Sequence, residues 1–273
     1  VHSAYQQDES AIPAIVEIML KKTALAALIA LFVLPFGYLT ALSLAGEWRY
    51  PDLLPSGWTL MHWIDLGASG GNWLGSVLTS LVLASSVGFL SAAMGFLTAK
   101  ELSWHPKRQL WLTLAYLPYV FSPVIYAHCI KFFFNVSNLS GTFGGVLIAQ
   151  FILTYPFAVI LFFNHFDHRL RAMEELAYTL GANERTAFRR VLIPVSRKVL
   201  LICFFQTFLI SWFEYGLTSV IGTGQVRTLT IAVYQYIGEA NQYVAALAGC
   251  LVCIPPLVLL WLNQRFVFNE KIA

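Results

Sequence analysis

Apolar residues fill this chain in long stretches, without the alternating or one-faced patterns of a soluble domain. A membrane-spanning helix needs roughly 20 mostly apolar residues, because the hydrocarbon layer is about 30 Å thick. Six stretches meet this length, and the pattern therefore predicts an all-α membrane protein with about six transmembrane helices. They run from about Thr23 to Leu44, Ser76 to Ala99, Leu110 to Ile130, Phe143 to Phe163, Val199 to Ile221 and Tyr243 to Leu262.

Several of the predicted spans contain proline, which removes a backbone donor and bends a helix. Pro118 and Pro123 fall in the third stretch, Pro156 in the fourth, and Pro255 and Pro256 in the sixth. In a bilayer, neighbouring helices or polar side chains must satisfy the freed carbonyl groups. We therefore expect kinked helices that pack together in a bundle.

The composition supports a single membrane domain over residues 23–262. Hydrophobic residues make up 58% of the chain and charged residues only 11%, whereas charged residues make up roughly a quarter of a soluble protein. Residues 1–22 and 263–273 are then an N-terminal and a C-terminal tail. The first 18 residues have no membrane period; they form a flexible tail, or translation begins at Met19.

The distribution of basic residues predicts the orientation. If the N-terminus is cytoplasmic, only three of the 17 Lys and Arg residues lie on the outer side: Arg49, Lys131 and Arg227. Cytoplasmic loops of membrane proteins carry the excess of Lys and Arg. We therefore expect a multi-pass membrane protein with both termini in the cytoplasm.

Chemical machinery is sparse on this chain. No lysine follows a glycine, so the phosphate-binding sequence of nucleotide hydrolases is not found. The four cysteines have no spacing that indicates a zinc site or a disulfide framework, and Cys250 and Cys253 are read as small packing residues. The sequence predicts no catalytic residue, no metal site and no cofactor on the chain itself.

The most distinctive segment is the long basic loop at residues 164–198. Met173, Leu176, Ala177 and Leu180 recur at helical spacing, and Gly181 follows them as a helix C-cap would. Asn183 can cap a second short helix, which we expect to end at Pro194. Leu176, Ala177 and Leu180 are predicted to pack back against the spans. Arg185, Arg189 and Arg190 are predicted to face elsewhere.

This loop resembles the "EAA" loop of permease subunits from binding-protein-dependent ATP-binding-cassette (ABC) importers. That pattern is Glu-Ala-Ala, three residues, Gly, about nine residues, and a hydrophobic-x-Leu-Pro ending. Glu175-Leu176-Ala177, Gly181 and Val191-Leu192-Ile193-Pro194 match it, with Leu176 and Ile193 as conservative departures, and Ala182 and the run Phe188-Arg189-Arg190 are also similar. The wider resemblance covers about Ser76 to the C-terminus.

The resemblance implies a type I importer permease (MetI-like) architecture with a cytoplasmic coupling helix at about residues 181–191. That helix would enter a groove of a separate ATPase subunit and transmit its motion to the spans. The residues implied for this coupling are Glu175, Ala177, Gly181, Ala182, Arg185, Phe188, Arg189 and Pro194. For the arginines, the positive-inside rule alone is an equal explanation.

The resemblance also implies the partners. They are two ATPase subunits that bind the ATP, an extracytoplasmic substrate-binding protein, and a second permease subunit that is either a copy or a sister of this chain. The resemblance places this assembly in the bacterial inner membrane, with membrane lipid around it and no nucleic acid as a partner. The cargo is a small solute of the thiamine, ferric-iron, sulfate or polyamine type, which one sequence does not rank.

Glu214 is the clearest charged residue within a predicted span. Charged groups in the membrane are costly and often mark a functional site. Glu214 could line the translocation path. It could equally pair with a polar group such as His128 or Gln206 and hold helices together.

Two other classes of membrane protein compete with the importer. A secondary transporter driven by an ion gradient favours inverted internal repeats with broken helices at matching positions, and no such symmetry is visible. An intramembrane enzyme needs a paired nucleophile and base or metal ligands within the spans, which His128 and Glu214 do not supply.

Overall fold

The structure is a computed structural model that describes residues 2–48, 52, 54–68 and 73–264, and it leaves out the side chains of residues 2–18 and of Phe32. Within these ranges the chain is helical, and its only extended pairing is an isolated bridge between Ala45 and Trp58. Among the described residues, the all-α prediction is confirmed. The predicted C-terminal tail lies almost wholly outside them.

Five helical segments are long and apolar enough to cross a membrane. They are α1 (His2–Ser43, with Met19–Ser43 as its apolar part), α3 (Trp73–Ser103), α6 (Phe143–His165), α12 (Gln242–Asn263) and the segment Glu184–Trp212, which contains α9 (Ile193–Trp212). Helix α1 has no break, so the residues predicted as an N-terminal tail continue the first spanning helix.

The third predicted span, which brings the number of passes from five to six when it is counted as one, consists of two pieces. Helix α4 (Arg108–Tyr116) and a 3-10 turn η1 (Leu117–Val120) meet α5 (Pro123–Val136) at an angle of 98°. The predicted span from about Leu110 to Ile130 is therefore not one continuous helix, and the kink expected from its prolines is a sharp break. The break precedes Pro123, and proline disfavours a helical conformation in the residue before it.

The predicted fifth span, Val199 to Ile221, is also wrong in its boundaries. Helix α9 begins earlier and ends at Trp212, and a separate short helix α10 (Gly216–Gly222) follows after a turn at Phe213–Tyr215. The apolar run continues through this turn, so hydropathy alone does not reveal it. The remaining helices are α2 (Met61–Ala68), α11 (Leu229–Gly238), and the pair α7 (His168–Thr179) and α8 (Glu184–Ala187) between α6 and α9.

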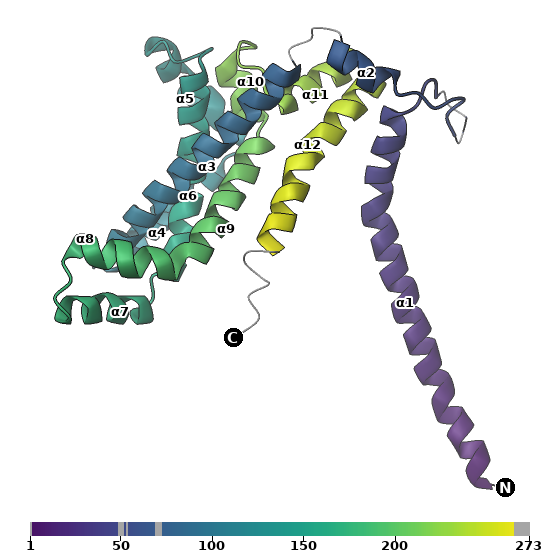
Figure 1. Ribbon diagram of the computed structural model, residues 1–273, viewed down its shortest axis with the longest axis horizontal. Coiled ribbons are helices and arrows are strands. Elements are labelled where there is room, and N and C mark those ends of the chain that lie inside the picture. The colour runs from purple at the N-terminus through teal and green to yellow at the C-terminus, as the bar shows by residue number, and fades with distance from the viewer. Residues whose placement is uncertain (1, 49–51, 53, 69–72, 265–273) are drawn as a thin grey trace.

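Helices α3, α6 and α9 lie side by side as the centre of the bundle, with α12 beside them, while α1 leans away (Figure 1). Small residues bring the helices close together: a Cβ atom on Gly95 of α3 would lie 2.5 Å from the Cβ atom of Ala158 on α6. Close backbone approach through small residues is how helices pack in membranes. On α1, most described apolar side chains remain exposed.

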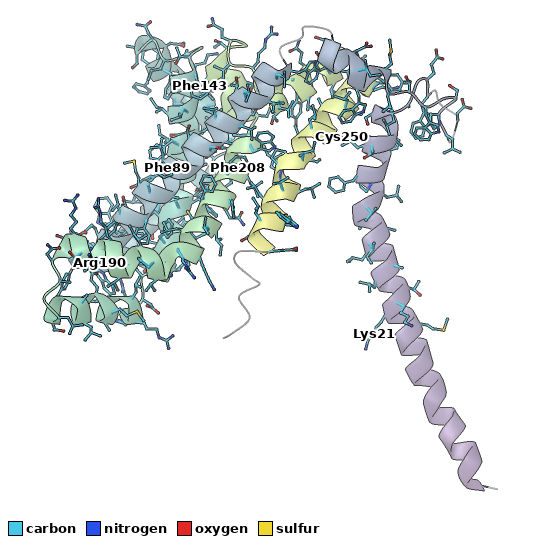
Figure 2. All side chains as sticks on the ribbon, in the orientation of Figure 1. Lys21, Phe89, Phe143, Arg190, Phe208 and Cys250 are labelled. Carbon is cyan, nitrogen blue, oxygen red and sulfur yellow. The ribbon has the colours of Figure 1, made fainter. Side chains whose placement is uncertain are left out.

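The two ends of the bundle differ in what they carry. Helices α2, α5, α10 and α11 lie at one end, and the α7–α8 region, the N-terminus and the end of α12 lie at the other (Figure 1). Lys21 and Arg190 therefore lie toward the same end of the molecule, opposite Phe143 (Figure 2). With five spanning helices, or six when the bent pair of α4 and α5 counts as one span, the described residues agree with the prediction of about six crossings.

Candidate functional site: the α7–α8 turn

The basic loop between α6 and α9 folds into a compact protrusion at one end of the bundle (Figure 1). It consists of α7 (His168–Thr179), a short helix α8 (Glu184–Ala187) and a π-helical turn η2 (Phe188–Leu192) that leads into α9. We call residues 168–192 the α7–α8 turn. Two short helices joined at a tight turn were predicted here, and they are present.

Both ends of α7 are capped by residues close in sequence. The backbone N–H of Leu170 donates to the Asp167 carboxylate at 2.9 Å, and this hydrogen bond lowers the pKa of Asp167. At the other end Gly181 has φ +84°, a left-handed conformation that glycine adopts without steric cost. The N–H groups of Gly181 and Ala182 donate to the carbonyls of Tyr178 and Ala177, both at 3.0 Å.

This double hydrogen bond is the Schellman arrangement, which ends a helix and reverses the chain in a fixed direction. Asn183 then caps α8, since its side-chain oxygen accepts the N–H of Thr186 at 2.8 Å. The predicted roles of Gly181 as C-cap and of Asn183 as N-cap are confirmed. The reversal of the chain at residues 177–186 is therefore held by local hydrogen bonds.

The predicted stop at Pro194 is wrong. Helix α8, the π turn η2 and α9 follow one another directly, and Pro194 is exposed near the start of α9. A local change to π-helical bonding accommodates a proline within a helix that crosses a membrane. The helix therefore continues from α8 through η2 into α9 without a break in the chain of helical turns.

The buried face of α7 also differs from the prediction. Leu170, Glu174 and Ala177 face the bundle and are buried, whereas Leu176 and Leu180 are 60% and 80% exposed. Leu170 packs with Phe96, Phe162 and Phe166, and this cluster seats the start of α7. Helical spacing predicts which residues share a face. It does not decide which face turns inward when polar residues there find partners.

Glu174 is the buried charged residue of the turn that sequence reasoning missed. Its carboxylate lies 2.9 Å from the Nζ of Lys100 at the end of α3 and accepts the hydroxyl of Tyr178 at 2.7 Å. The hydrogen bond to Glu174 raises the pKa of Tyr178 to about 12. Nearby, the Arg171 guanidinium lies 4.6 Å from the ring centroid of Trp104, a cation–π contact.

The residues predicted for coupling fall into two groups. Ala177 is buried, Ala182 is half-buried, and Phe188 packs its ring 5.9 Å from that of Phe96. These three support the turn from inside. The others are exposed on its surface: Glu175, Gly181, Arg185, Arg189 and Pro194.

The exposed charges of the turn are mostly free to meet a partner. Glu175 is paired within α7 to Arg171, at 2.8 Å between Nε and Oε1, and both side chains are at least half exposed. Such an exposed pair contributes little to stability. Arg185, Arg189 and Arg190 are exposed, but Arg185 also lines a cavity together with Leu97 and Lys100 of α3.

Glu214 lies at the opposite side of the bundle centre, in the turn between α9 and α10. Its carboxylate accepts the N–H of Leu217 at 2.7 Å, and the N–H and hydroxyl of Thr218 at 3.0 and 2.9 Å. It therefore caps the start of α10. The predicted pairing with His128 or Gln206 is wrong: His128 contacts the carbonyl of Val124, and Gln206 is exposed.

A bundle of about six apolar passes with a structured basic turn between the fourth and fifth passes defines a multi-pass membrane transport protein. The family model of the binding-protein-dependent transport system inner membrane component matches residues 94–269. The chain belongs to this family. It is the membrane-spanning permease component of a binding-protein-dependent ABC importer.

Known relatives of the chain are permeases with different named substrates. A Salmonella choleraesuis protein, PhnV, whose name assigns it to a 2-aminoethylphosphonate transport system, is 27% identical over 87% of this chain and 92% of its own. A Haemophilus influenzae protein, FbpB 2, named as an Fe(3+)-transport system permease, is 24% identical over 71% of this chain and 40% of its own.

Solved structures share the fold at low sequence identity. A bacterial ABC transporter involved in the import of the acidic polysaccharide alginate matches with a TM-score of 0.70 and 16% identity, over 91% of this chain and 95% of that one. A bacterial alginate transporter in complex with a periplasmic protein bound to an alginate pentasaccharide matches with a TM-score of 0.66 and 15% identity, over 93% and 96%.

Proposed function

We propose that this chain forms one half of a transmembrane permease dimer and that its α7–α8 turn is the contact through which a separate ATPase drives transport. A solute delivered by an extracytoplasmic binding protein passes inward by alternating access. The second half is a copy of this chain or a sister permease. The α7–α8 turn and both termini are cytoplasmic in this proposal.

The observation that carries the proposal is the exposed apolar surface of α7. Leu176 and Leu180 are large apolar side chains in a protrusion that is otherwise rich in charge, and both are more than half exposed. An exposed apolar patch with a polar rim is typical of a protein–protein contact. Arg185 in α8 and Arg189 in η2 are exposed on the same turn and suit a partner with an acidic rim.

The rigidity of the turn supports the same role. The two hydrogen bonds that close the Gly181 turn and the cap at Asn183 fix the direction of α8. Because α8 continues into α9, a push on the turn reaches a spanning helix without an intervening flexible link. The ATP in this proposal is bound by the ATPase, and the chain holds no cofactor.

The family assignment disfavours a secondary transporter driven by an ion gradient. For the solute, the proposal stays at the breadth of the sequence analysis: thiamine, ferric iron, sulfate or polyamine. The relatives' names extend this range to 2-aminoethylphosphonate.

The test compares two glycines with the same backbone conformation. Gly181 has φ +84° and Gly224, between α10 and α11, has φ +77°, and a Cβ atom at either position would meet no atom within 4 Å. A side chain at either site therefore imposes a similar backbone strain, about 1–2 kcal/mol. Only Gly181 lies on the α7–α8 turn.

We expect Gly181→Glu to abolish co-purification of the ATPase subunit while the protein stays in the membrane. Gly224→Glu should retain the ATPase, and Gly181→Asn should retain it too, because asparagine tolerates the left-handed conformation. The measurement is quantitative co-purification from detergent-solubilised membranes. Undiminished recovery of the ATPase with Gly181→Glu would contradict the proposed contact.

A further inference from the structure

One lysine at the end of α3 contacts every helical piece of the α7–α8 turn. The Nζ of Lys100 lies 2.9 Å from Glu174 on α7 and 3.8 Å from Glu184 on α8, and 5.8 Å from the ring centroid of Phe188 in η2. No other pair of described residues joins α3 to α7 through opposite charges. Lys100 therefore connects the turn to the central helix of the bundle.

The pair of Lys100 and Glu174 is shielded from water, unlike the other ion pairs of the turn. Their side chains are 12% and 10% exposed, against 79% for Glu184. A shielded pair is screened little by salt, and removal of one partner strands the other charge. The Tyr178 hydroxyl adds a hydrogen bond to the same carboxylate and fixes its direction.

Apolar packing alone does not fix how α8 sits against α3. A cavity of about 300 Å³ lies between them, lined by Leu97, Lys100, Glu101, Glu184, Arg185 and Phe188. Aromatic contacts of Phe96 and the cation–π contact of Arg171 with Trp104 also join the turn to the α3 region. The ion pair of Lys100 and Glu174 adds the shielded, directional contact between charged groups at this junction.

We propose that Lys100 is a positioning residue for energy coupling: through Glu174 it locks the α7–α8 turn to α3, so that the turn and α3 move as one body. The proposal rests on the proposed function, in which an ATPase displaces this turn. Helix α3 packs most extensively of all helices against α6 and α9. A turn locked to α3 therefore moves α3 and the helices packed against it, in addition to α9, which continues from the turn.

The test follows distances in the complete complex of permease and ATPase, with and without MgATP and vanadate. Nitroxide labels are placed at exposed sites, after replacement of the native cysteines: Phe89 on α3, Ala172 on α7 and Val258 on α12. The distance between Ala172 and Val258 reports whether the ATPase moves the turn at all. The distance between Phe89 and Ala172 reports whether α3 follows.

In the wild-type complex we expect the Ala172–Val258 distance to shift on vanadate trapping and the Phe89–Ala172 distance to stay single and unchanged. Lys100→Met and Glu174→Gln should each make the Phe89–Ala172 distance shift or broaden on trapping, while the ATPase still co-purifies. The exchanged pair, Lys100→Glu with Glu174→Lys, should restore the single distance. Recovery in the exchanged pair would show that the opposite charges, and not either side chain alone, hold the Phe89–Ala172 distance.

Two matched variants serve as controls. Lys107→Met removes an exposed lysine just beyond the end of α3, and Glu184→Gln removes the exposed, more distant acidic partner. Both should behave as wild type, because exposed charges contribute little. An unchanged Phe89–Ala172 distance in Lys100→Met, or no recovery in the exchanged pair, would overturn the inference. If the Ala172–Val258 distance did not change on vanadate trapping in the wild-type complex, that result would instead overturn the proposed function.

Discussion

Neighbouring residues of the α7–α8 turn have opposite environments, and this difference determines what each can do. Glu175, which matches the family pattern, is exposed and paired only to Arg171, whereas Glu174 is buried against Lys100 and Tyr178. The sequence shows two adjacent carboxylates and does not say which one turns inward. Both carboxylates lie three or four residues from Arg171 and from Tyr178, so helical spacing does not separate Glu174 from Glu175.

Glu214 provides a prediction at the same scale. Glu214→Ala leaves the N–H groups of Leu217 and Thr218 without an acceptor, and a buried unsatisfied group costs about 1–3 kcal/mol. We expect a clear loss of thermal stability in detergent with Glu214→Ala and a smaller loss with Glu214→Gln, which keeps one acceptor oxygen. The apparent affinity for solute should be unchanged.

The alternative role of Glu214 predicts the reverse pattern. If its carboxylate lines the translocation path, Glu214→Gln alters solute affinity while the melting temperature stays at the wild-type value. That outcome would contradict a purely capping role.

At the scale of elements, hydropathy predicted how many times the chain crosses but not where the crossings break. The break before Pro123 and the turn after Trp212 both lie inside continuous apolar runs. Proline marks the first break, whereas the second is set by Glu214 folding back onto α10. Conversely, Pro194 looked like a stop and is not, because the π turn before it carries the helix onward.

Close packing of α3 on α6 gives a prediction for these elements. A methyl group on Gly95 would meet Ala158 at 2.5 Å, so Gly95→Ala must push the two helices apart. Overpacking of this kind costs about 1–3 kcal/mol. We expect Gly95→Ala to lower the melting temperature and the amount of protein in the membrane.

Gly144 on α6 is the matched control, since a methyl group there would meet no atom within 4 Å. Gly144→Ala should melt at or slightly above the wild-type temperature. Equal stability of the two variants would contradict the close approach of α3 and α6.

At the scale of the whole molecule, the bundle separates two surfaces with different chemistry. Helices α2, α10 and α11 lie at one end, and the α7–α8 turn, which meets the ATPase in the proposal, lies at the other (Figure 1). The family and the number of spans could be predicted from the sequence, because hydropathy and the spacing of Gly181 are local signals. The Lys100 contact could not, because it joins residues 74 positions apart.

The most direct measurement places a photoreactive residue at Leu180, the most exposed apolar side chain of the α7–α8 turn, in membranes of the source cell. Ile237 on α11, at the opposite end and 58% exposed, is the comparison site. The account predicts that illumination links Leu180 to the ATPase subunit and that Ile237 gives no such product. Labelling of Leu180 by reagents confined to the outer side of the membrane, or a product with the binding protein at this site, would contradict it.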